Sequence, residues 1–189
     1  VFGFTNEIMY MLMDIIEINN KLLASLDEQA EASERKRMYC DLRTSPNDGG
    51  QRMLNVLLPG TKVPIHRHPN SNENVLCLSG KLVEVLYEED SCNRTAGVET
   101  HDRAEGLLLK EYARILLDPS AGSYGCVVPA GVWHTVEVNE PAVIYEAKDG
   151  RYGEDGSETF DEYKTKVAQD PSQSSFPTAS ETSKRTSST

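Results

Sequence analysis

Beyond residue 50 the chain consists of short apolar runs separated by turn-forming residues, and this pattern limits the fold more than any other feature. Runs of this length that are rich in valine and leucine, with Gly, Pro and Asn between them, are typical of β-strands. Several such strands in succession predict an all-β sandwich or barrel, which we place at residues 51–165. The runs are Met53–Leu58, Val63–Ile65, Val75–Leu78, Leu82–Tyr87, Cys126–Val128, Val132–Val138 and Val143–Ala147.

Two segments inside this region are less regular. The apolar residues of Leu107–Leu117 have a spacing close to that of a helix, but the segment lies between strands. We therefore predict a strand over Glu111–Leu117. Residues 88–106 are polar and acidic and are predicted to form a long loop, which in a domain of this size is usually functional or mobile.

Residues 14–50 are predicted to form a strand and a helix that pack on the barrel. Ile15, Ile16 and Ile18 resemble a short strand. Residues 20–33 follow with leucines on one face and an asparagine in position to cap the helix. Residues 1–13 are a candidate extension, because Met13 could be the natural start of the protein. At the other end, residues 166–189 are rich in Ser and Thr and are predicted to be a disordered tail.

Charge and composition exclude several classes of function. The formal net charge is -11, whereas a nucleic-acid-binding protein needs a basic surface. The one basic cluster, at residues 35–37, is flanked by acidic residues and is interpreted as solvated surface. No stretch of about 18 apolar residues is present to span a membrane. The N-terminus lacks the features of a signal peptide, and the four cysteines have no CxxC spacing, so we expect a cytoplasmic protein with reduced thiols.

Three of the four histidines occur at positions that favour a metal site. His66 and His68 are two residues apart, so on a strand both rings point to the same face. Glu73 follows after a short turn, and His134 comes from a separate apolar strand. Three imidazoles and one carboxylate can hold one divalent ion of Zn, Fe, Mn, Ni or Co. The alternative is a hydrogen-bonded pair of core histidines. His101, in the predicted loop, is expected to be exposed.

These residues occur in the order and spacing of the two cupin motifs. Gly60, five residues, His66-Arg67-His68, four residues, Glu73, six residues and Gly80 match the first motif at every position. Pro129-Ala130-Gly131, two residues and His134 match the second, although its closing Asn is displaced to Asn139 and Ser123 occupies the place of its opening Gly. The resemblance implies a cupin double-stranded β-helix, or jelly-roll barrel, with a metal ion bound by His66, His68, Glu73 and His134.

A closer resemblance is to the WbuC-type cupin metalloproteins, and it covers roughly residues 14–165. It is carried by NKLLASLDEQAEASERKRMYCDLR, QRMLNVLLPGTKVPIHRHPN and VPAGVWHTVEVNEPAVIYEAKDGRYG. That family is typically encoded among bacterial genes for surface polysaccharides. The resemblance therefore implies a metal-binding barrel, and it associates the chain with sugar-related chemistry in polysaccharide biosynthesis.

Four further side chains are candidates for the pocket of the barrel. If Arg52 points inward, it can clamp a carboxylate or phosphate, and Asn55 on the same strand then faces the other way. Alternatively, Arg52 can hold the N-terminal helix in place. Glu146 is a candidate acid or base, and Lys148, on the same face, is a candidate substrate-binding residue; both can equally form an outer ion pair. Tyr152 can close the mouth of the barrel or simply pack there.

Three functions agree with these features. The leading hypothesis is a metal-dependent enzyme, either an isomerase or epimerase or a dioxygenase, that acts on a small oxygenated, sugar-like substrate. A non-catalytic module that binds or senses a small ligand through its metal is the alternative, and a purely structural barrel is the third. Exposed sheet edges also favour a homodimer formed through the N-terminal strand and helix.

Overall fold

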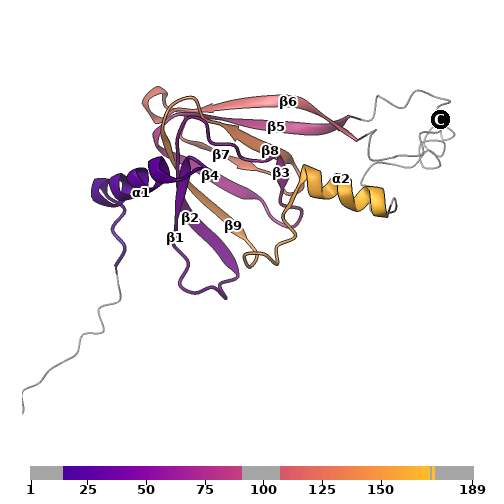
Figure 1. The fold of residues 1–189 in the computed structure, drawn as a ribbon, viewed down its shortest axis with the longest axis horizontal. Coiled ribbons are helices and arrows are strands. Elements are labelled where there is room, and N and C mark those ends of the chain that lie inside the picture. The colour runs from indigo at the N-terminus through magenta and orange to yellow at the C-terminus, as the bar shows by residue number, and fades with distance from the viewer. Residues whose placement is uncertain (1–14, 91–106, 171, 173–189) are drawn as a thin grey trace, which may run out of the picture.

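The computed structural model describes residues 15–90, 107–170 and 172, which form two facing five-stranded antiparallel sheets flanked by two helices (Figure 1). The first sheet has the order β1 (Arg37–Asp41), β2 (Gly50–Leu57), β9 (Ala142–Asp149), β4 (Glu73–Gly80) and β7 (Gly125–Val128). The second has the order β10 (Glu158–Thr159), β3 (His66–Arg67), β8 (Trp133–Glu137), β5 (Leu82–Asp90) and β6 (Leu108–Leu117). A short 3-10 helix covers Pro119–Ala121.

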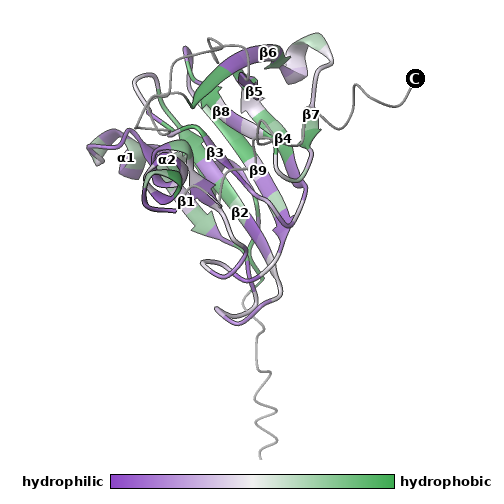
Figure 2. Ribbon diagram, turned by 90° about the vertical axis from the view of Figure 1, so that its right-hand side faces the viewer, coloured by the Kyte–Doolittle hydropathy of each residue, from purple (hydrophilic) through white to green (hydrophobic). Residues whose placement is uncertain are grey.

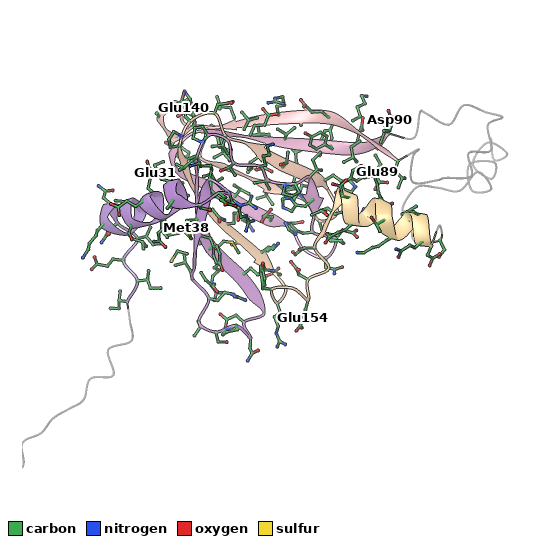
Figure 3. The ribbon with its side chains drawn as sticks, viewed as in Figure 1. Glu31, Met38, Glu89, Asp90, Glu140 and Glu154 are labelled. Carbon is green, nitrogen blue, oxygen red and sulfur yellow. The ribbon has the colours of Figure 1, made fainter. Side chains whose placement is uncertain are left out.

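The predicted all-β jelly-roll fold is confirmed, but the sheets do not close into the predicted barrel. Among the described residues, no hydrogen-bonded ladder joins an edge strand of one sheet to an edge strand of the other. At one edge, β3 and β10 contain only two residues each and cannot extend far enough to make such a ladder. The two sheets are instead held together by the side chains between them (Figure 3).

The N-terminal helix forms as the sequence predicts, whereas the N-terminal strand lies elsewhere. Helix α1 runs over Asn20–Ala32, and the Asn19 side chain caps it by accepting from two backbone amides. Its buried residues Leu26 and Ala30 pack on the outer face of the first sheet, beside Met38 of β1 (Figure 3). Ile15–Ile18 is exposed and forms no strand, and the strand that pairs with β2 on this side is β1.

The interior changes from apolar to polar along the strands. Inward-facing residues alternate with outward-facing ones, and Figure 2 shows the resulting hydrophobic and hydrophilic bands. On β4 the inward residues are Cys77, Val75 and Glu73, which pair with Ile144, Glu146 and Lys148 of β9. The Cys77 end belongs to the main apolar core, and the Glu73 end faces the predicted metal ligands. One end of the sandwich therefore stabilises the fold while the other end is left for polar groups.

A second helix packs on the outer face of the second sheet. It lies partly within the residues that were predicted to be a disordered tail. Helix α2 spans Phe160–Gln169 and begins with a capping box formed by Thr159 and Glu162. Its buried residues Tyr163 and Val167 pack against Trp133, on the face of β8 opposite His134. Because this apolar contact extends to Val167, residues 166–169 are helical rather than part of a disordered tail. Residues 173–189 lie outside the described residues.

The remaining expectations concern loops, thiols and membranes. Strand β5 continues to Asp90 and β6 begins at Leu108, so the predicted strand at Glu111–Leu117 is part of a longer one. The centre of the predicted loop, with His101 and Cys92, lies outside the described residues, as do residues 1–14.

The described cysteines, Cys40, Cys77 and Cys126, are free thiols. No helix in the described ranges is long and apolar enough to cross a membrane.

Lys36, between α1 and β1, has a left-handed backbone (φ 53°), a conformation that costs a side chain with a Cβ about 1–2 kcal/mol. Its carbonyl accepts from the Leu58 amide at 2.9 Å, which fixes this turn on the end of β2. We expect Lys36→Gly to raise the free energy of unfolding by about 1 kcal/mol, after the greater freedom of glycine in the unfolded chain is subtracted. Urea denaturation measures this change, and destabilisation would show that the turn carries no strain.

Candidate metal centre and cavity

The four predicted metal ligands converge at the polar end of the interior. His66 of β3 pairs in register with His134 of β8, and His68 follows β3 directly. Glu73 enters from the opposite sheet as the first residue of β4. Each of the four offers one ligand atom, and these atoms all lie within 4.8 Å of one another. The sequence prediction that separate strands bring these residues together is therefore confirmed.

Hydrogen bonds hold the side chains of this cluster around Glu73. Its Oε2 atom lies 2.9 Å from Nε2 of His134 and 3.2 Å from Nε2 of His68. The ring centroids of His66 and His134 are 4.2 Å apart. His68, Glu73 and His134 are all buried. The Nε2 atoms of two histidines and the carboxylate thus face one centre among buried side chains.

The other ring nitrogens contact oxygen atoms behind the cluster. Nδ1 of His66 lies 3.0 Å from the Pro64 carbonyl, and Nδ1 of His134 lies 2.9 Å from the Val132 carbonyl. Nδ1 of His68 is 2.7 Å from Oγ of Ser157, whose own proton goes to Asp155 at 2.5 Å. Metal-binding histidines commonly donate their second N–H to such an oxygen, which directs the free nitrogen to the ion. The cluster therefore fits a divalent metal both in its donor atoms and in the groups that orient them.

Burial and mutual hydrogen bonds set the protonation of the cluster. Burial lowers the pKa of His66 to about 3, with a smaller contribution from the neighbouring His134, so His66 is neutral at physiological pH. Burial opposes ionisation of Glu73, but hydrogen bonds from His134 and His68 outweigh it and hold the pKa of Glu73 well below its usual value. Burial by itself would lower the pKa of His134, but the hydrogen bond to Glu73, the charge of Glu73 and the bond to the Val132 carbonyl together raise it. The carboxylate is thus ionised and ready to bind a cation.

The cluster opens onto a cavity of about 510 Å³ between the two sheets. This volume is typical of sites for small ligands. One wall consists of inward-facing residues of β1, β2 and β9, and the other contains the histidines with Glu84 and Val136. A ligand in this cavity would contact the cluster on one side and the first sheet on the other.

Glu146, the predicted acid or base, lines the cavity on β9. Its Oε2 atom accepts a hydrogen bond of 2.6 Å from the Asn55 amide, so Asn55 faces inward and Arg52, of opposite parity on β2, does not. Burial raises the pKa of Glu146 to about 8, and the charges of Glu73 and Glu84 act in the same direction. At neutral pH this carboxyl group therefore keeps its proton.

Glu84 of β5 is a cavity residue that the sequence analysis did not identify. It is 1% exposed, and neither carboxylate oxygen has a hydrogen-bond partner in the protein. Burial raises its pKa to about 7, whereas the charge of His134 acts in the opposite direction. The available signal was one glutamate inside the apolar run Leu82–Leu86, where a side chain pointing inward has to be buried.

The other three predicted pocket residues differ in their positions. Lys148 lines the cavity, with Nζ 2.9 Å from Nδ1 of His68 and 3.3 Å from Asp155. Tyr152 lies on the lining and is largely exposed, as expected at a mouth. Arg52 does not line the cavity, because it lies on the outward parity of β2 and pairs with Asp48 at 2.5 Å. The structure thus brings Glu146, Lys148 and Tyr152 together with the cluster and leaves Arg52 apart.

The sequence was compared with protein-family models and with curated proteins. A family model described as "Domain of unknown function (DUF6016)" matches residues 18–97, which is less than half of the chain. No curated protein matches this sequence.

Solved structures of similar fold include a cupin-2 domain protein, an oxidase and a polysaccharide assembling protein. A cupin-2 domain protein, Rru_A2000 from Rhodospirillum rubrum, is 13% identical, with 82% of this chain and 74% of that one covered and a TM-score of 0.40. Oxalate oxidase in complex with glycolate is 15% identical over 68% of this chain and 57% of that one, with a TM-score of 0.43. CapF, a capsular polysaccharide assembling protein from Staphylococcus aureus, is 18% identical over 67% of this chain and 30% of that one, with a TM-score of 0.42. The chain spans only part of the length of each of these proteins.

Proposed function

We propose that this protein is a metal-dependent enzyme that acts on a small, sugar-like substrate. His66, His68, Glu73 and His134 would hold one divalent ion. The observation that carries the proposal is the convergence of their ligand atoms within 4.8 Å, at the wall of a cavity that also contains the carboxyl groups of the buried Glu84 and the partly buried Glu146. When bound, such an ion supplies a Lewis acid that polarises a carbonyl or hydroxyl oxygen.

The two carboxyl groups are suited to proton transfer at neutral pH. Glu84 belongs to β5 of the second sheet and Glu146 to β9 of the first, so they reach the cavity from opposite walls. Their pKa values, about 7 and about 8, lie near physiological pH, where acid and base catalysis is most effective. One group can take a proton from a carbon next to a carbonyl while the other returns a proton from the opposite side. This chemistry favours isomerisation or epimerisation over oxygenation.

The sugar-like substrate rests on the sequence resemblance to the WbuC-type cupins, whose genes accompany those for surface polysaccharides. A cavity of about 510 Å³ with an amide and several carboxyl groups provides hydrogen-bonding partners for the hydroxyls of one sugar unit. We therefore place the reaction in the formation or modification of a sugar for such a polymer.

The alternative is a module that binds a small ligand through its metal without changing it. Such a protein needs no titratable group near the ligand, and an apolar or amide-lined pocket would serve it. Glu84 favours the enzyme, because a buried carboxyl group without a partner costs stability and is commonly retained for a chemical role.

Metal analysis and solvent exchange together test the proposal. We expect about one divalent ion per chain in the wild type and in Glu146→Gln, and almost none in His134→Ala. In D₂O, the wild type loaded with metal should exchange a carbon-bound proton of a sugar acid or keto sugar, and Glu146→Gln should do so at least about 100-fold more slowly. His101→Ala serves as the histidine control. If the wild type purifies without metal and takes up none, the enzyme hypothesis and the binding module both fail.

Metal retention without exchange on a broad panel of sugars would instead favour the binding module. Unchanged exchange in Glu146→Gln would remove this residue from the mechanism.

A further inference from the structure

Two arginines at the mouth of the cavity lack the acidic partners that the other described arginines have. Neither Arg35 nor Arg37 forms an ion pair. This is unusual in a chain with 30 acidic and 19 basic residues, where carboxylates are abundant. The other arginines of the described ranges each pair with a carboxylate and are Arg43, Arg52, Arg67, Arg114 and Arg151.

Both side chains line the cavity that holds the predicted metal ligands. Arg35 lies in the turn that connects α1 to β1, and its backbone amide donates to the Ser33 hydroxyl at 3.2 Å. Arg37 is the first residue of β1 and is half-buried, with Nη1 donating to the Lys62 carbonyl at 3.3 Å. Burial lowers the pKa of Arg37, and the nearby charge of Arg35 lowers it further. Arg37 is therefore not simply solvated surface, whereas Arg35 is exposed, as predicted for residues 35–37, and also lines the cavity.

Nearby groups do not neutralise this charge. Asp41, on the same face of β1, is bound to Arg43 at 2.7 Å. The other cavity cation, Lys148, is balanced by Asp155. Glu146 is the carboxyl group whose field reaches Arg37, but its pKa of about 8 keeps it protonated at neutral pH. Two guanidinium groups thus remain uncompensated at the entrance of a cavity in an otherwise acidic protein.

We propose that Arg35 and Arg37 form a subsite for an oxyanion, so that the substrate carries a carboxylate or phosphate group. Guanidinium groups bind both anions through paired hydrogen bonds. In the context of the function proposed above, the hydroxyl-bearing part of an acidic sugar would face the metal cluster, and its anionic end would remain at the mouth. The subsite selects sugar acids or sugar phosphates over neutral sugars.

Calorimetric titration of the metal-free protein with inorganic phosphate tests the subsite without reference to the metal. We expect the double variant Arg35→Gln/Arg37→Gln to bind phosphate at least about tenfold more weakly than the wild type, because a charge-assisted hydrogen bond contributes that much or more. Arg52→Gln is the matched control, since this arginine lies outside the cavity, and it should bind as the wild type does. Equal binding by the double variant, or an equal loss in Arg52→Gln, would overturn the proposal.

The same proteins loaded with metal identify the anion. D-glucuronate, D-glucose 6-phosphate and D-glucose present a carboxylate, a phosphate and no charge on similar rings. The wild type should prefer one or both acidic sugars to glucose by at least about tenfold, and the double variant should lose this preference while keeping its metal. A variant that keeps the preference would contradict the subsite. Loss of metal by the wild type would instead count against the proposed function and leave the phosphate result standing.

Discussion

Divalent metal is expected to raise the free energy of unfolding of this protein by about 4 kcal/mol when the free ion is about 1,000 times its Kd. The ion would bind the folded chain, where three imidazoles and the Glu73 carboxylate converge within 4.8 Å, and not the unfolded chain, where they are dispersed. Glu73→Gln removes the one anionic ligand, so we expect this variant to lose most of the gain. Urea denaturation with and without added Zn²⁺ or Mn²⁺ gives the difference for each protein.

The quantity to compare is the gain in the free energy of unfolding on adding metal, measured separately for the wild type and for Glu73→Gln. Glu73 also accepts hydrogen bonds from His68 and His134, so its replacement changes the metal-free protein as well. His101→Ala provides a control that keeps the four predicted ligands, and it should gain as much stability from metal as the wild type. An equal gain in Glu73→Gln would place the ion elsewhere.

Glu84→Gln should make the metal-free protein less sensitive to pH between 4.5 and 8. The folded-state pKa of Glu84 is raised from 4.5 to about 7, so over that interval the native state holds a proton that the unfolded chain has released. The free energy of unfolding therefore falls as the pH rises, by about 3 kcal/mol for this group. Glutamine cannot ionise, so the variant avoids this loss and keeps only the dependence contributed by other groups, among which Glu146, with its pKa raised to about 8, acts in the same direction.

Urea denaturation at pH 5 and pH 8 in the presence of a chelator measures this effect. The matched control is Glu88→Gln, on the same strand but exposed and paired with Lys110, and it should change the pH dependence by less than about 1 kcal/mol. If Glu84→Gln loses as much stability as the wild type between the two pH values, Glu84 is not a buried carboxyl group. The proposed acid and base pair would then lose one member.

The local parts of the structure followed from the sequence. Alternation with a period of two placed His66 and His68 on one face, and both belong to the cluster of predicted ligands. The cap at Asn19 marked the start of α1. Each of these features depends on neighbours a few residues away, so a single sequence contains enough to predict it.

The tertiary structure decided what depends on pairing between distant segments. Whether Glu84 is buried without a partner depends on β8 and on the opposite sheet, and nothing next to it in the sequence reports that. Arg37 looked like solvated surface beside acidic residues, but pairing of β1 with β2 turns it toward the cavity, which the exposed Arg35 in the preceding turn also lines. The same pairing leaves Arg52 outside it. The direction of a side chain is a local property of its strand, whereas the space into which the side chain points is set by long-range packing. For that reason the sequence alone revealed the ligands but not the cavity around them.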